Sequence, residues 1–133
     1  MNRTLVLIAV SILAAGCASG PTRMKDEAGY ERYRPYLGEP ISQFTAFHFD
    51  SWEVASANQV VIWTNPGEAY LVTVWNTCRD LNFVQHIGVT STGSTVSKGE
   101  SLRVGRQTCP IESIRPIDVH RFKADRAALH ETK

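Results

Sequence analysis

The chain of 133 residues lacks an excess of charge of either sign. Lys and Arg number 14 and Asp and Glu 13, which gives a formal net charge of +1 at pH 7, and the charges are scattered along the sequence. A nucleic-acid-binding domain clusters positive charge on one face or along one helix. The composition therefore argues against nucleic acid as a partner.

The chain also lacks the sequence motifs of common catalytic sites. It contains no G-x-S-x-G nucleophile elbow, no H-E-x-x-H zinc motif, no glycine-rich phosphate loop and no dinucleotide-binding fingerprint. The absence of a C-x-x-C pair removes the usual signal for thiol exchange. We therefore assign no catalytic residue, no cofactor and no metal from the sequence.

Long apolar runs are missing as well. Residues 5–16 form a run of apolar and small residues, which is shorter than the roughly 20 residues that a membrane-spanning helix needs. Arg3 before the run and Cys17 after it give the three-part layout of a secretory signal. Leu-Ala-Ala-Gly-Cys, at residues 13–17, resembles the bacterial lipobox, with leucine one position further from the cysteine than is commonest. An ordinary signal peptide is the alternative.

The lipobox resemblance implies that Cys17 becomes the first residue, with diacylglycerol on its thiol and an acyl chain on its amine. Two or three chains anchor a protein far more firmly than one. The residue after Cys17 is Ala18 and not aspartate, and in this the chain resembles lipoproteins that pass to the outer membrane. We therefore expect a lipid-anchored protein of the bacterial cell envelope, on the periplasmic face of the outer membrane, with an envelope protein as a second partner.

Composition predicts three segments. Residues 1–16 are the expected signal peptide, residues 17–29 the lipidated cysteine with a flexible tether, and residues 30–133 a single β-rich domain. The tether is expected because "ASGPTRMKDEAG" is small, polar and charged. Pro35 and Pro40 prevent a long helix, so we expect the domain to begin with a short helical turn or an irregular cover.

Cys78 and Cys109 are the cysteines that remain once Cys17 carries lipid. In an oxidising compartment a lone pair of thiols usually forms a disulfide. Free thiols and half of a metal site are the alternatives, and zinc sites usually show ligands closer together in sequence. A disulfide that closes a loop of roughly 30 residues stabilises a fold by about 3–4 kcal/mol in the chain-entropy treatment.

Short strands are expected through the middle of the chain. Residues 59–64 and 69–75 are rich in β-branched and aromatic side chains, and Pro66 and Gly67 between them suit a type II-like turn with positive φ at the glycine. Pro110 and Pro116 confine residues 109–119 to a sheet edge or a loop. Further short strands are expected at residues 44–49, 82–91, 95–97 and 101–105.

The C-terminal residues "DVHRFKADRAALHETK" change to helical spacing, with Val119, Phe122, Arg126 and Leu129 near one stripe and Asp118 able to cap the start. Strands and helices do not alternate along the sequence, and this argues against a parallel sheet. The expected fold is mainly β within the α+β class: a small antiparallel sheet, curled or sandwich-like, with a C-terminal helix and one disulfide.

The candidate binding residues are three tryptophans and a polar pair: Trp52, Trp63, Trp75, Arg79 and Asp80. Trp63 and Trp75 are expected in the two arms of the hairpin, at similar distances from its turn, where filling the core is the default role. Exposed tryptophans would instead indicate a contact surface. Arg79 and Asp80 fit a turn better than a binding contact.

The candidates for a hydrolytic or metal site are two histidines, each with a carboxylate two residues away: His48 with Asp50, and His120 with Asp118. Residues two apart on a strand share a face, so either pair can hold a metal or polarise a base. Such a site needs about three convergent groups, and no sequence feature brings the two pairs together. Ordinary surface histidines are the favoured interpretation.

The segments "GEPISQF", "YLVTVWNTCRDL", "IGVTSTGSTV" and "CPIESI", spread over roughly residues 38–117, resemble a family of small uncharacterised proteobacterial lipoproteins. The resemblance implies a single disulfide-bonded domain and brings no known activity. We expect a non-enzymatic binding or structural module of the envelope. An inhibitor of a periplasmic or cell-wall enzyme and a small metal-dependent hydrolase are the alternatives.

Overall fold

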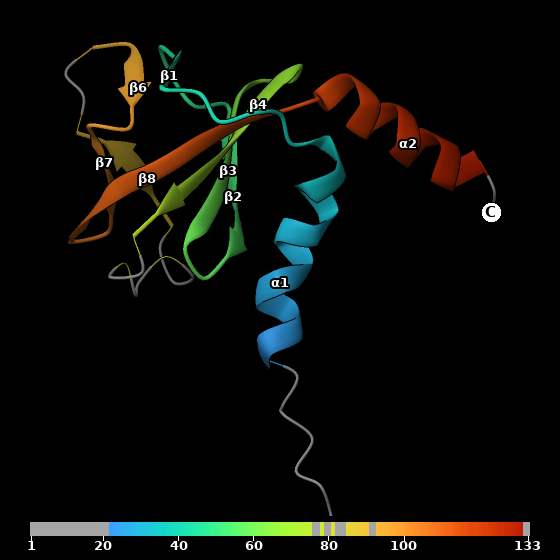
Figure 1. The fold of residues 1–133 in the computed structure, drawn as a ribbon, viewed down its shortest axis with the longest axis horizontal. Coiled ribbons are helices and arrows are strands. Elements are labelled where there is room, and N and C mark those ends of the chain that lie inside the picture. The colour runs from blue at the N-terminus through green and yellow to red at the C-terminus, as the bar shows by residue number, and fades with distance from the viewer. Residues whose placement is uncertain (1–21, 76–77, 79–80, 82–84, 91–92, 132–133) are drawn as a thin grey trace, which may run out of the picture.

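The computed structural model describes residues 22–75, 78, 81, 85–90 and 93–131. Its main feature is a curled six-stranded antiparallel sheet with the strand order β2-β3-β4-β8-β7-β5, beside a small sheet of β1 and β6 (Figure 1). The mainly β fold with a C-terminal helix and one disulfide is confirmed. The elements are α1 (Thr22–Tyr33), the 3₁₀ turn η1 (Arg34–Tyr36), β1 (Gln43–Thr45), β2 (Ser51–Ser56), β3 (Gln59–Asn65), β4 (Glu68–Val74), β5 (Ile87–Val89), β6 (Thr95–Ser97), β7 (Ser101–Val104), β8 (Gln107–Ile117) and α2 (Val119–Glu131).

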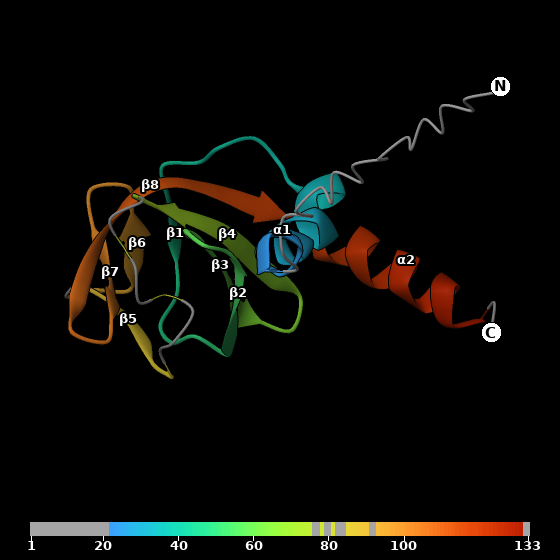
Figure 2. The ribbon, with the colours of Figure 1, turned by 90° about the horizontal axis from the view of Figure 1, so that it is seen from below.

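Both faces of the large sheet are covered. Val60 and Ile62 of β3 point into a cluster that includes Phe44 of the small sheet, and Val61 between them points into a cluster that includes Phe122 of α2. This alternation is expected because neighbouring strand residues face opposite sides of a sheet. The two helices lie at one end of the sheet, and β5 and β7 lie at the other (Figure 2).

The β3–β4 hairpin is confirmed, but its turn differs from the expected type. A type II turn requires positive φ at Gly67. Among the glycines that the structure describes, Gly105 alone has a left-handed φ, at 60°. The Gly67 N–H instead donates to Asn65 Oδ1 at 2.9 Å, and the Asn65 amide donates to Glu68 Oε2 at 3.0 Å. The asparagine side chain thus stabilises the turn in place of a left-handed glycine.

The position of β8 overturns the expectation of an edge strand or loop at residues 109–119, because β8 pairs with both β4 and β7. The N–H and C=O of a strand residue point to the same side. The carbonyls of Pro116 and Ile114 accept hydrogen bonds at 2.8 Å from the N–H groups of Gly38 and Ile41, respectively. The nitrogen of Pro116 therefore also points away from β4, and its missing N–H costs no bond to that strand.

Helix α1 occupies residues for which the sequence predicted a tether followed by a short turn. Gly29 lies so close to β2 that a Cβ at this position would be 2.5 Å from the carbonyl oxygen of Ala55. Tyr33 is buried in the last turn of α1, and the helix ends there because Pro35 follows. Residues 22–29 are thus helical. The composition of this segment does not predict that the helix packs on β2.

Helix α2 confirms the predicted cap but not the full predicted stripe. The Arg121 N–H donates to Asp118 Oδ1 at 3.1 Å. Val119 and Phe122 are buried, whereas Leu129 is 70% exposed. The helix is therefore attached to the domain through its first turns, and its C-terminal half extends away from the sheet (Figure 1).

The Cys78–Cys109 disulfide is confirmed, with Cα atoms 5.5 Å apart and a sequence separation of 31. Both cysteines are buried in the same cluster as Val60. The predicted strand at 82–91 is described as a strand only over β5, and the one predicted at 44–49 is a strand only over β1, after which Phe47 is 88% exposed. In the part of the chain that the structure describes, no helix is long and apolar enough to cross a membrane.

Candidate functional site

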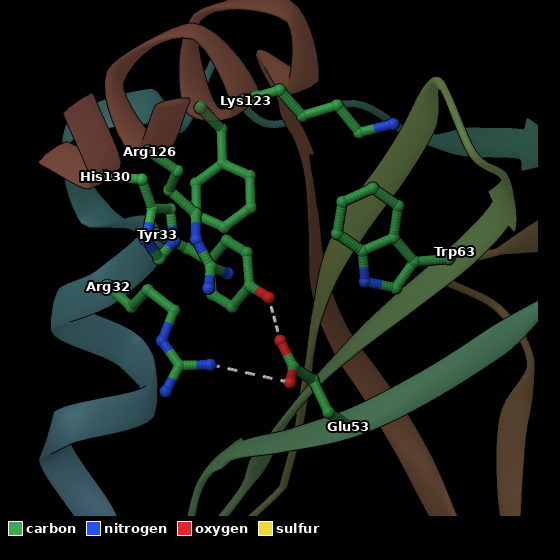
Figure 3. Close-up of a pocket in the computed structure, with 8 residues that line it drawn as sticks. Arg32, Tyr33, Glu53, Trp63, Lys123, Arg126 and His130 are labelled. Carbon is green, nitrogen blue, oxygen red and sulfur yellow. Dashed lines mark hydrogen bonds and ion pairs between the residues drawn. The ribbon is translucent and has the colours of Figure 1, made fainter. Parts of the chain in front are cut away.

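An open hollow of about 430 Å³ lies where α1, β2, β3 and α2 meet (Figure 3). Two kinds of side chain dominate its lining, aromatic rings and cations. In the close-up, Trp63 stands on one side of the hollow and Tyr33 and Arg126 on the other, with Glu53 between them at one end and Lys123 at the other. The lining residues are Arg32, Tyr33, Glu53, Trp63, Phe122, Lys123, Arg126 and His130.

The aromatic rings are organised around Phe122, which is buried in the second turn of α2. Its ring centroid lies 4.9 Å from that of Tyr33, 6.3 Å from that of Trp63 and 5.5 Å from that of Tyr36. Ring pairs at such separations gain about 0.5–1.5 kcal/mol beyond their area of burial. Phe122 therefore fixes the position of α2 against both α1 and β3, and with it the side chains that α2 presents to the hollow.

Glu53 supplies the one carboxylate among the described residues of the lining. The buried residue Tyr33 donates its hydroxyl hydrogen to Glu53 Oε1, which gives the phenol a hydrogen-bond partner within the fold. Arg32 Nη1 lies 3.7 Å from Glu53 Oε2. Because the carboxylate has both of these partners within the fold, it stabilises the wall of the hollow rather than presenting an unpaired negative charge.

Three basic side chains of α2 face the hollow: Lys123, Arg126 and His130. Their spacing of three and four residues places them on one face of the helix. The Arg126 guanidinium lies over the Phe122 ring, 5.4 Å from its centroid, and Lys123 Nζ donates to the Pro66 carbonyl oxygen. The arrangement suits the binding of an anionic group next to an apolar ring.

A second contact between η1 and α2 lies beside the hollow. The Tyr36 hydroxyl donates to Asp125 Oδ2 at 2.7 Å, and Arg121 lies over the Tyr36 ring at 5.6 Å from its centroid. The hydrogen bond to Asp125 is the main cause of a raised pKa at Tyr36, since it favours the neutral phenol. This contact joins the segment after α1 to the middle of α2.

Comparison with protein families matches residues 1–133 to a family of unknown function, DUF6491. The chain belongs to the DUF6491 family. Comparison with curated proteins and with solved structures found no match. The family description assigns no activity to DUF6491, so the chemistry of this member rests on its own side chains.

The three tryptophans of this DUF6491 chain have different surroundings. Trp63 lines the hollow, and Trp52 packs partly buried against the larger core cluster. Trp75 is 55% exposed and lies beyond the end of β4. The expected placement of Trp63 and Trp75 at similar distances from the turn is wrong, because Trp63 pairs with Ala69 next to the turn and Trp75 lies at the opposite end of the hairpin.

The pair of His48 with Asp50 and the pair of His120 with Asp118 do not meet in either hollow that His48 lines. His48 follows β1 and lines two small hollows, neither of which includes His120 or Asp118. Asp118 instead caps α2, and His120 lies in the first turn of that helix. Among the residues with described positions, no three His, Cys, Asp or Glu side chains are placed to hold a metal ion.

Of the predicted site residues, Cys17, Arg79 and Asp80 lie outside the described residues. Sequence reasoning identified Trp63 but missed the rest of the hollow. The spacing of Lys123, Arg126 and His130 within a predicted helix was a signal that could have identified one wall. The other walls come from α1 and β2, and no sequence pattern indicates that these segments meet α2.

Proposed function

We propose that this DUF6491 protein is a lipid-anchored protein of the bacterial cell envelope that binds a partner protein and carries out no catalysis. The anchor is the Cys17 lipid implied by the lipobox resemblance of residues 13–17. An envelope enzyme as partner would make the protein an inhibitor.

The observation that carries the binding role is the hollow itself. It combines aromatic rings held by Phe122 with cations on the exposed face of α2. Aromatic residues and arginine are the side chains that contribute most at protein interfaces. Among the described residues that line the hollow, no serine, threonine or cysteine stands beside a histidine, and these residues suit recognition better than nucleophilic catalysis.

The position of the hollow along α1 fits an anchored protein. Helix α1 begins at Thr22, five positions after Cys17, and the lining residues Arg32 and Tyr33 lie at its other end. A helix rises 1.5 Å per residue, so these side chains lie about 15 Å along α1 from its start. This short length of α1 supports the proposal, because a hollow close to an anchor at Cys17 would be within reach of a partner in the periplasm.

Photocrosslinking in cells tests the proposal. A photoreactive amino acid at position 127 stands one helical turn from Lys123 and from His130, so it lies on the rim of the hollow without replacing a lining residue. The matched control is position 128, because Ala127 and Ala128 are both exposed residues of α2 and point in different directions.

We expect a discrete crosslinked protein from position 127 that is absent or much weaker from position 128. Equal crosslinking from the two positions, or none from position 127, would contradict a binding role for the hollow.

A further inference from the structure

We infer that the hollow binds an acidic segment of a partner protein, with an aromatic side chain of that segment packed against the partly buried Trp63 indole. The inference rests on the proposed function and adds the chemistry of the ligand. Three features of the hollow carry it: the balance of charge, the length of the row of cations on α2, and the position of the rings.

The balance of charge selects an anion. Lys123 and Arg126 face the hollow with positive charge, and the basic side chain of His130 lies further along the same helix. Glu53 provides the negative charge of the lining, and it is already bonded to Tyr33 and near Arg32. The potential in the hollow is therefore positive along α2, and complementary charge both speeds encounter and disfavours cationic partners.

The row of cations is too long for a single anionic group. Residues 123 to 130 are seven positions apart, which corresponds to about 10 Å along the helix axis. One carboxylate can contact one or two of these side chains. An extended segment rises about 3.3 Å per residue, so carboxylates two or three residues apart match the spacing of Lys123, Arg126 and His130.

The openness of the hollow also favours a segment of a partner over a small molecule. Sites for small molecules are concave and bury most of the ligand surface. Here the cationic side, Arg32, Lys123, Arg126 and His130, is exposed. A flat membrane surface is disfavoured in turn, because the rings of Tyr33 and Phe122 are buried beneath these side chains and a bilayer cannot enter the hollow.

The aromatic side chain of the partner is inferred from Trp63. Its indole is partly buried and stands across the hollow from Tyr33, separated from Phe122 by a centroid distance of 6.3 Å (Figure 3). A guest ring placed against Trp63 would also lie near the Arg126 guanidinium, which already stacks on Phe122. Contacts of a ring with both an indole and a guanidinium are common at protein interfaces.

Three synthetic pentapeptides test the inference by titration calorimetry in low-salt buffer: Gly-Glu-Phe-Glu-Gly, its Gln-Phe-Gln counterpart and its Glu-Ala-Glu counterpart. We expect the first to bind and the other two to bind about tenfold more weakly or not at all. The double variant Lys123→Gln/Arg126→Gln should lose about tenfold in affinity for the first peptide, and added salt should weaken binding to the unaltered protein.

Arg106→Gln is the matched control, since Arg106 is an exposed arginine of the turn between β7 and β8, which lies at the other end of the sheet from the helices. Circular dichroism checks that each variant is folded, and a variant that is unfolded is replaced by the single Lys123→Gln change.

Three results would overturn the inference. One is equal affinity of the unaltered protein for the three peptides. Another is an affinity of the double variant for the first peptide that equals that of the unaltered protein. The third is the absence of peptide binding together with binding of an aromatic anion alone, such as anilinonaphthalene sulfonate, or of phosphatidylglycerol vesicles. If crosslinking from position 127 persists in any of these cases, the partner-binding function stands and the ligand chemistry inferred here fails.

Discussion

Tyr70 is the tyrosine whose ionisation the fold changes most clearly. Its ring stacks on Phe44 with centroids 4.2 Å apart, and its hydroxyl donates to Glu68. Burial, followed by the hydrogen bond to Glu68, raises the pKa of Tyr70 to about 12 from the usual 10.0. Between these two pH values the unfolded chain loses the proton and the folded chain keeps it, so stability falls as pH rises through this window.

We predict that the free energy of unfolding of the unaltered protein falls relative to that of Tyr70→Phe as pH rises from 9 toward 12. The reason is that phenylalanine has no proton to lose in the unfolded state. Urea unfolding at several pH values measures the difference. A difference that stays constant across the series would show that Tyr70 ionises alike in both states.

Gly29 is a residue at which two effects of a methyl group oppose each other. Alanine is favoured over glycine in a helix by about 1 kcal/mol. The Cβ of an alanine at position 29, however, would be 2.5 Å from the Ala55 carbonyl oxygen and 2.8 Å from its Cα, which are backbone atoms. Overpacking of this kind costs typically about 1–3 kcal/mol, so the clash outweighs the gain in helix propensity.

We therefore predict that Gly29→Ala lowers the free energy of unfolding, as measured by denaturant titration. Gly99→Ala is the control, because its Cβ would meet only Ser97 Oγ, at an ordinary contact distance of 3.8 Å. A Gly29→Ala protein as stable as the control would mean that α1 does not pack on β2 at this point.

Residue by residue, the sequence identified the disulfide partners and Trp63 but not the remainder of the hollow. Cysteines can be paired by counting, because few of them are present. Arg32 and Glu53 come from segments with no shared pattern, and the contact between them arises from the packing of α1 on β2. Long-range contacts of this kind are not encoded in local spacing.

At the level of elements, the hairpin and the C-terminal helix were predictable because period and turn residues agree. The central position of β8 was not predictable, since a proline disrupts a central strand only where its nitrogen faces a partner strand. The carbonyl of Pro110 accepts from the N–H of Trp75 at 3.1 Å, so its nitrogen points away from β7, just as that of Pro116 points away from β4. The direction in which a proline nitrogen points is a property of strand register, which composition does not show.

The attachment of α2 makes its N-cap important for the hollow. Asp118 Oδ1 accepts from the Arg121 N–H at 3.1 Å. We predict that Asp118→Ala lowers the free energy of unfolding by about 1 kcal/mol, the usual effect of losing a cap. Denaturant titration measures this change, and Asp118→Ser, which keeps an acceptor, should retain most of the stability. Equal losses in the two variants would show that the cap contributes little.

On the scale of the whole molecule, the proposal joins an anchor at one end of α1 to a hollow at the other. We predict that Cys17→Ser leaves an unlipidated precursor, because the serine hydroxyl does not replace the thiol as the site of diacylglycerol attachment. Fractionation of cells and mass spectrometry measure this outcome. A Cys17→Ser protein that is processed and membrane-bound like the unaltered one would refute the lipid anchor.

The most direct test of a partner-binding hollow compares two tryptophans in the crosslinking experiment from position 127. Trp63 lines the hollow, whereas the exposed Trp75 lies at the other end of the β3–β4 hairpin. We predict that Trp63→Ala abolishes most of the crosslinked product and that Trp75→Ala leaves its yield unchanged. Loss of the product in Trp75→Ala with full yield in Trp63→Ala would contradict the account, because the partner would then bind at the opposite end of the hairpin.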